Sequence, residues 1–213
     1  MEAKDWPAAM QPLLEKYKRH KHPLEYKNIY QLLVMVVLSA QDSDAHINKI
    51  APVFFEKYPN MESLSKANTA QLTEALSDVR FHTNKIAWLQ EIAETVKEDK
   101  NIPLTMKGLT ALKGVGRKSA NVIMREAGAE VEGIMVDLHV VRVAPRIGIA
   151  SGKDANKIEK QLMEALPKDM WGDIGMAISY LGRETCRPSN PKHSECVVRD
   201  VCEYCRSKQE QMS

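Results

Sequence analysis

The sequence lacks an excess of charge of either sign and has few aromatic residues. Its 213 residues include 30 lysines and arginines and 28 aspartates and glutamates, a formal net charge of +2, and 6% of the residues are aromatic. Average charge therefore gives no indication of nucleic-acid binding, and any such surface must concentrate its cations on one face. Hydrophobic residues at 44% and charged residues at 27% are typical of a globular chain and exclude a disordered one.

Long apolar runs are also missing. The longest lies around residues 32–38, far short of the roughly 20 residues that cross a bilayer. We interpret it as a buried helix and expect no membrane association. The first residues, Met1 to Trp6, lack the apolar run of a signal peptide, so we expect a cytoplasmic protein.

No cysteine occurs before residue 186. All four lie between Cys186 and Cys205, and cytoplasmic thiols are kept reduced. Four thiols in one short segment therefore indicate a metal or iron–sulfur site, not a set of disulfides.

The alternation of apolar and polar residues that marks β-strands is absent, except for a very short run at residues 133–136. Helical periodicity takes its place. Segment 29–40 is nearly all apolar, as expected of a central core helix. Apolar residues recur at helical spacing in segments 45–58, 69–76, 84–97, 155–166 and 170–181. The sequence therefore predicts an all-α fold.

A glycine-rich turn joins two helical stretches within residues 109–123. It reads Gly114–Val115–Gly116, and we expect this turn to be too tight for a side chain at either glycine position. Glycine there allows positive φ and a close approach of backbone to a ligand. The second helix is expected to begin at Arg117, with its first N–H groups facing an anion such as a DNA phosphate. A plain link between two helices is the alternative interpretation.

Lys118 falls in the first turn of that second helix. The positive end of the helix dipole and the neighbouring Arg117 both disfavour a charged ammonium at this position. A lysine pushed toward its neutral form is a competent amine nucleophile. A surface lysine that contacts phosphate explains this segment equally well when it is taken alone.

Asp137 follows an apolar approach and precedes a further helical stretch, which predicts a helix N-cap. Capping is ordinary structure. A carboxylate held at this point can also stabilise the oxocarbenium ion that develops when a glycosidic bond breaks.

These motifs together resemble the endonuclease III family, a bifunctional branch of the helix-hairpin-helix DNA glycosylases. The resemblance rests on residues 114–118 followed by Val136-Asp137-x-His139, and on residues 38–44, which are similar to the family's Leu-Ser-Ala-Gln-x-x-Asp segment. It extends over nearly the whole chain. Lys118 distinguishes the chain from the adenine-specific branch, which lacks a lysine there.

The resemblance implies a two-domain helix-hairpin-helix DNA glycosylase fold. A six-helix domain would cover residues 22–130, with the hairpin at about 109–123. A cluster domain would combine residues 1–21 with 131–213 and hold a [4Fe–4S] cluster in segment 186–205. The catalytic cleft would lie between the two domains.

The resemblance also implies roles for single residues. Lys118 would attack C1′ of a flipped nucleotide, expel the base and form a Schiff base, and β-elimination would then cut the strand. Asp137 would assist by proton transfer and by stabilising the sugar cation. Gln41 would fill the vacated stack, and Phe81, where the family has an aliphatic residue, would be the wedge. The other predicted DNA contacts are Gly114, Val115, Gly116, Arg117, His139, Arg187 and Lys192.

The cysteine tail departs from the family pattern. The positions that match the family's four cysteines hold Cys186, His193, Cys196 and Cys202, and a further thiol follows at Cys205. We favour Cys205 as the fourth cluster ligand because thiolates are the usual ligands of such clusters. Direct ligation by His193 and a zinc site in place of the cluster are the alternatives.

The predicted function is base-excision repair by a bifunctional glycosylase and abasic-site lyase acting on oxidised pyrimidines. Its partner would be double-stranded DNA with a damaged base or abasic site, bound by a monomer associated with the nucleoid. One alternative is a catalytically inactive damage-binding protein of the same fold. Another is a redox iron–sulfur protein, which leaves the glycine turn and the Asp137 segment unexplained.

Overall fold

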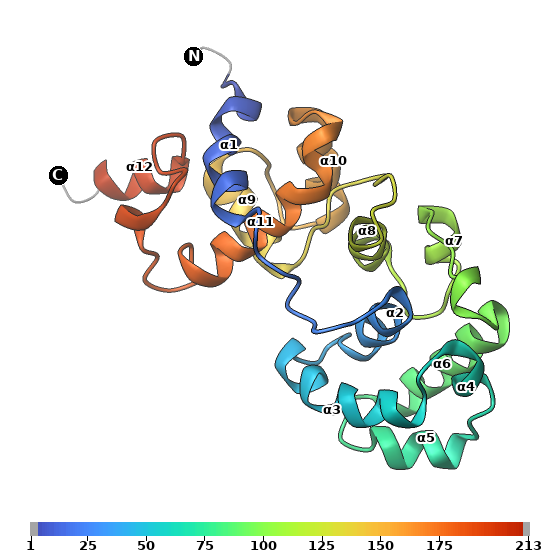
Figure 1. The fold of residues 1–213 in the computed structure, drawn as a ribbon. Helices are drawn as coiled ribbons and strands as arrows, with labels where there is room; N and C mark the ends of the chain where they lie inside the picture. The colour runs from blue at the N-terminus through green and yellow to red at the C-terminus, as the bar shows by residue number, and fades with distance from the viewer. Residues whose placement is uncertain (1–3, 211–213) are drawn as a thin grey trace. The chain divides into compact units, whose positions relative to one another are not determined.

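A computed structural model describes residues 4–210 of the chain, and these residues form helices with no strand among them (Figure 1), which confirms the predicted all-α class. The α-helices are α1 (Trp6–Tyr17), α2 (Ile29–Leu38), α3 (Asp44–Lys57), α4 (Met61–Ser65), α5 (Thr69–Leu76), α6 (His82–Val96), α7 (Met106–Thr110), α8 (Arg117–Glu126), α9 (Leu138–Ile147), α10 (Ala155–Ala165), α11 (Trp171–Glu184) and α12 (Glu203–Glu210). Short 3₁₀ turns lie at η1 (Asp99–Asn101), η2 (Lys168–Met170) and η3 (His193–Glu195).

Each segment with helical periodicity folds as a helix, with ends that differ from the prediction by a few residues. The periodicity did not reveal α1, whose sequence contains two prolines. Pro7 lies in the first turn, where a missing N–H costs nothing, and the Asp5 side chain caps the helix by accepting a hydrogen bond from Ala8 N at 3.1 Å. The apolar run at residues 133–136 is a buried loop.

The chain divides into two compact units. We call residues 21–130 the hairpin unit and residues 1–20 with 131–213 the terminal unit. Residues 1–3 and 211–213 of the predicted cluster domain lie outside the described residues. No helix within residues 4–210 is long and apolar enough to cross a membrane.

The hairpin unit is built around α2, in which Tyr30 and residues 32–38 are buried. Helices α3, α6 and α8 pack on it, and α4 and α5 pack on α6. A nearly all-apolar helix is expected at such a centre, because every face of it loses contact with water. Because α2 is buried, it holds in place the start of the loop at residues 39–43 that follows it.

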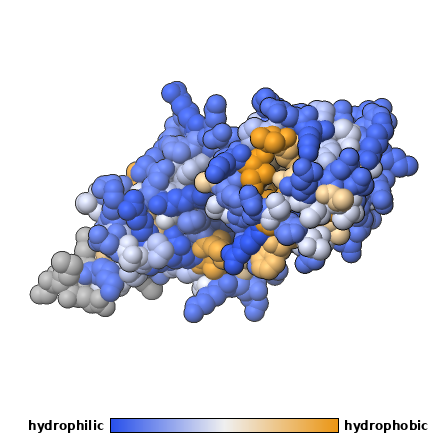
Figure 2. Space-filling view, turned by 90° about the horizontal axis from the view of Figure 1, so that it is seen from below, coloured by the Kyte–Doolittle hydropathy of each residue, from blue (hydrophilic) through white to orange (hydrophobic). Residues whose placement is uncertain are grey.

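The terminal unit has its own core, formed where α11 packs against α1 and α9. Gly175 of α11 allows close contact, since a Cβ there would lie 2.3 Å from Met135 O. This contact holds the loop at residues 133–136, which leads directly into Asp137, against α11. The molecular face in Figure 2 is mostly hydrophilic, with a small exposed group of hydrophobic side chains.

Candidate functional site

The glycine turn connects α7 to α8 as predicted, but its two glycines have different roles. Gly114 has φ +76°, and a Cβ there would lie 2.6 Å from the Trp88 ring. Gly116 has extended backbone, φ −92° and ψ 175°, and a Cβ there would meet nothing within 4 Å. The expectation that both positions exclude side chains is therefore wrong for Gly116, whose missing side chain instead leaves open space.

Helix α8 begins at Arg117 with Gly116 as its N-cap, so no N-cap side chain bonds to its first turn. Lys118 lies in this turn and is exposed. The positive end of the helix is thus presented beside two basic side chains, an arrangement suited to an anion.

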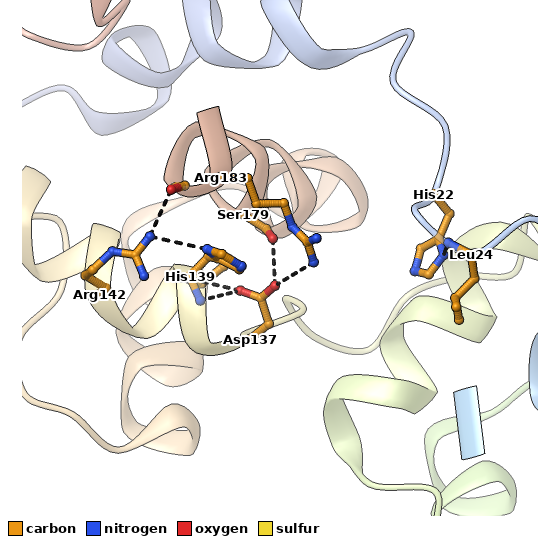
Figure 3. Close-up of polar contacts among 9 residues, drawn as sticks. His22, Leu24, Asp137, His139, Arg142, Ser179 and Arg183 are labelled. Carbon is orange, nitrogen blue, oxygen red and sulfur yellow. Dashed lines mark hydrogen bonds and ion pairs between the residues drawn. The ribbon is translucent and has the colours of Figure 1, made fainter. Parts of the chain in front are cut away.

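A half-buried imidazole lies within electrostatic range of Lys118. His22 precedes α2, and its Nδ1 accepts a hydrogen bond from Leu24 N at 3.1 Å (Figure 3). Burial lowers the pKa of His22 to about 4; the charges of Lys118 and Arg125 lower it further, whereas that of Glu126 opposes the change. Sequence reasoning did not single out His22, because the charged groups near it lie on α8 and α3.

Asp137 is the N-cap of α9, as predicted. Its Oδ1 accepts hydrogen bonds from His139 N and Val140 N, both at 2.9 Å (Figure 3). Its Oδ2 accepts a hydrogen bond from Ser179 Oγ at 2.6 Å, and Arg183 Nη2 lies 4.0 Å from the same oxygen. Donors on both oxygens fix the plane of the carboxylate, and the N-terminus of α9 favours its negative charge.

Ser179 is a site residue that sequence reasoning missed. It lies on α11 and is 1% exposed. The only signal was a hydroxyl between apolar residues on a buried helix, which usually bonds back to its own helix. Here it bonds instead to a carboxylate 42 positions away in sequence.

Gln41 and Phe81 share an unusual backbone conformation. They have φ of +58° and +57°, and both side chains are exposed, Phe81 to 53%. Left-handed backbone at residues other than glycine costs about 1 kcal/mol or more each and persists only where the surroundings enforce it. The two residues predicted to enter the duplex are thus both strained and presented to solvent.

The other predicted DNA contacts lie in the terminal unit. His139 Nδ1 accepts a hydrogen bond from Arg142 Nη2 at 3.2 Å. Arg187 is exposed, and its carbonyl accepts a hydrogen bond from Arg146 Nη1 at 2.8 Å. Lys192 forms an ion pair with Glu195 at 3.0 Å, which partly neutralises its charge.

The four cysteines are free thiols, Cys186 and Cys196 half-buried and Cys202 and Cys205 buried. Burial raises the pKa of Cys196 and of Cys202, and the charges of neighbouring thiols raise both further, so the thiols lie within range of one another. Arg146 Nη1 lies 3.4 Å from Cys186 Sγ, and its guanidinium stacks on Tyr204 at 4.6 Å.

The thiol segment can be tested against the two kinds of metal centre. Among the described residues, no three or more His, Cys, Asp or Glu side chains converge as a site for one metal ion. Zinc needs its ligands about 2.3 Å from one point. A [4Fe–4S] cluster is held by one thiolate on each iron, so its ligands are spread more widely. Four neighbouring thiols, two of them buried and two half-buried, therefore fit a cluster better than a single ion.

Comparisons with known proteins agree with these features. Residues 34–168 match the family model of the HhH-GPD superfamily base excision DNA repair proteins. Endonuclease III of Synechocystis sp. is 34% identical over 84% of this chain and 83% of its own length. Endonuclease III of Bacillus subtilis is 34% identical over the same shares.

Solved structures give the same result. A trapped covalent intermediate of endonuclease III with DNA matches with a TM-score of 0.84 and 28% identity, over 95% of this chain and 96% of that one. A thermostable thymine-DNA glycosylase shares the fold, with a TM-score of 0.77 and 22% identity over 94% and 96%. The chain belongs to the endonuclease III family within the HhH-GPD superfamily of base excision DNA repair proteins.

Proposed function

We propose that this protein is a base-excision DNA glycosylase that also cleaves abasic sites, with Lys118 as nucleophile and Asp137 as the assisting carboxylate. The observation that carries the proposal is an exposed lysine in the first turn of α8, directly after the turn in which Gly114 has a positive φ. The trapped endonuclease III complex, a covalent intermediate with DNA, supports a covalent mechanism. The substrate is double-stranded DNA with a damaged base or an abasic site.

In the first step, Lys118 Nζ bonds to C1′ of an extruded nucleotide as the bond from C1′ to the base breaks. The base leaves with the electron pair and takes up a proton. The bond from C1′ to the ring oxygen O4′ then breaks, O4′ keeps the electron pair and takes up the proton that Nζ loses, and a Schiff base forms between Nζ and C1′. Loss of a proton from C2′ then expels the 3′ phosphate oxygen, which cuts the strand, and water releases the enzyme.

Asp137 stabilises the positive charge that the sugar develops as the base departs, and it can exchange a proton with the reacting groups. Its two backbone donors and Ser179 Oγ hold the carboxylate in one orientation. A fixed charge stabilises a transition state more effectively than one that must reorient.

Borohydride trapping on an abasic duplex tests the assignment. Wild type should form a covalent adduct and Lys118→Ala should form none. Lys113→Ala is the matched control because it removes an exposed lysine from the same hairpin. An adduct with Lys118→Ala, or its equal loss in Lys113→Ala, would overturn the role of Lys118.

We infer that the damaged bases are oxidised pyrimidines such as thymine glycol, on the basis of the family resemblance. An incision panel of oxidised, deaminated and abasic duplexes tests this choice. Release of the oxidised pyrimidine should be fastest; preference for a deaminated base would refute it. Because the substrate is chromosomal DNA, we propose that the enzyme associates with the nucleoid.

Membership of the family implies an iron–sulfur cluster in general terms. We propose a [4Fe–4S] cluster in the terminal unit, held by Cys186, Cys196, Cys202 and Cys205. Mutual proximity and burial of these thiols support the set. His193 is the weaker candidate because its ring packs against Tyr204, with centroids 5.7 Å apart. When bound, the cluster would cross-link the segment and contribute folding energy.

A further inference from the structure

Two loops of the hairpin unit carry the strained residues Gln41 and Phe81. The first, residues 39–43, joins α2 to α3, and the second, residues 77–81, joins α5 to α6. Phe81 is the N-cap of α6 but makes no side-chain cap bond. Neither residue is a type that adopts left-handed backbone readily, so contacts from elsewhere must enforce both conformations.

The side chain of Asp42 makes a direct bond between the loops. Its Oδ2 accepts a hydrogen bond from Arg80 N at 3.0 Å. Asp42 follows Gln41 and Arg80 precedes Phe81, so this bond joins the immediate neighbours of the two strained residues. Fixing both neighbours restricts the backbone angles available to Gln41 and Phe81.

The Asp42 carboxylate is itself held in place. Its Oδ1 accepts hydrogen bonds from Ser43 N at 2.8 Å and from His46 Nδ1, also at 2.8 Å. Only 10% of the Asp42 side chain is exposed. Hydrogen bonds to an ionised acceptor are stronger than those between neutral groups. The start of α3 therefore holds the Asp42 carboxylate in the position from which it bonds to Arg80 N.

A second contact joins the same two regions. Lys85 of α6 is 1% exposed, and its Nζ donates a hydrogen bond to Leu38 O, at the end of α2, at 2.7 Å. A buried ammonium needs such a partner. The Lys85 hydrogen bond joins the first turns of α6 to the end of α2. Asp42 joins the two adjacent loops, residues 39–43 and 77–81, to each other.

We propose that Asp42 is a positioning residue that holds Gln41 and Phe81 as one preformed edge for entry into the duplex. This inference rests on the proposed function, which requires a damaged nucleotide to leave the stack. Extrusion is most costly for a paired base, and side chains already placed for insertion need less ordering on binding. Asp42 should therefore matter most for lesions in a paired duplex and least for DNA that is already unpaired.

The test compares Asp42→Ala with Asp78→Ala. Asp78 is an exposed carboxylate in the 77–81 loop, so both variants change the charge equally, and only Asp42→Ala removes the inter-loop bond. We expect kcat/KM on a lesion in a paired duplex to fall about tenfold or more in Asp42→Ala and to stay near wild type in Asp78→Ala. Borohydride trapping on a single-stranded abasic site should be nearly unchanged in both.

Coupling to the wedge is measured with a double-mutant cycle. If Asp42 acts through Phe81, Asp42→Ala should have little further effect in a Phe81→Ala background. Additive effects, equal losses in Asp42→Ala and Asp78→Ala, or parallel losses on paired and single-stranded DNA would each overturn the proposal.

Two further measurements do not depend on base release or strand cleavage. Hydrogen exchange of the Arg80 amide should accelerate in Asp42→Ala, because its acceptor is lost. The fluorescence of 2-aminopurine placed opposite a tetrahydrofuran abasic analogue should rise on binding wild type and less on binding Asp42→Ala. Failure of wild type to trap abasic DNA would refute the proposed lyase, whereas unchanged exchange and fluorescence in the variant would refute the positioning role.

Discussion

Replacement of His22 should change how the stability of the protein depends on pH. His22 is neutral in the folded protein at neutral pH, since burial lowers its pKa to about 4 from the ordinary value of 6.5. Protonation also requires Nδ1 to give up its hydrogen bond from Leu24 N. The unfolded chain therefore binds this proton more readily than the folded one, and acid favours unfolding.

The size of the effect follows from these two pKa values. The stability contributed by neutral His22 is present above pH 6.5 and is lost as the pH falls toward 4. Linkage gives a loss of about 2 kcal/mol at pH 5 and about 3 kcal/mol at pH 4. His22→Asn keeps an acceptor near the position of Nδ1 but cannot titrate, so it should avoid this loss.

Urea denaturation of both proteins at pH 7.5 and pH 5 isolates the effect. Other titrating groups contribute equally to both proteins, so the difference of differences reports His22 alone. Wild type should lose about 2 kcal/mol more than His22→Asn between these pH values. Equal losses, or an NMR titration of the His22 ring with a midpoint near its ordinary value, would refute the reasoning.

Two further predictions concern Asp137 and the thiols. Ser179→Ala should slow single-turnover base release about tenfold with DNA affinity unchanged, because a hydrogen bond to a charged group is lost while no phosphate contact is removed; an unchanged rate would show that Ser179 does not orient the carboxylate. In protein purified without air, wild type should show the visible absorption of an iron–sulfur cluster and contain iron. Cys205→Ala should lose most of the iron and His193→Ala should keep it; the opposite result would assign the fourth ligand to the imidazole.

Sequence patterns predicted the parts of the protein that local backbone geometry determines. The cap at Asp137, the start of α8 at Arg117 and the positive φ of Gly114 each follow from a few consecutive residues. Helical periodicity located most of the longer helices for the same reason. It failed for α1, where prolines hide a helix that its cap and its packing on α11 stabilise.

The residues that sequence reasoning missed act across helices. Ser179 reaches Asp137 from another helix, and Asp42 reaches Arg80 across 38 positions. His22 has its low pKa because it is desolvated and because Lys118 and Arg125, far away in the sequence on α8, lie within electrostatic range of it. A periodic pattern identifies which face of a helix is buried, but it does not say which polar group the opposing element will supply.

This division explains how the chain can keep a family's chemistry while differing in its details. The proposed nucleophile, Lys118, and the proposed assisting carboxylate, Asp137, are each positioned within their own unit by local structure: the turn before α8 and the N-cap of α9. Asp42 bonds to the loop before Phe81, Ser179 bonds to the Asp137 carboxylate, and His22 lies within electrostatic range of Lys118. Substitutions at these three positions can therefore change rate, lesion preference or pH response without removing the reaction. Variation among relatives should therefore concentrate at such supporting contacts, and the three single substitutions described above measure each of them separately.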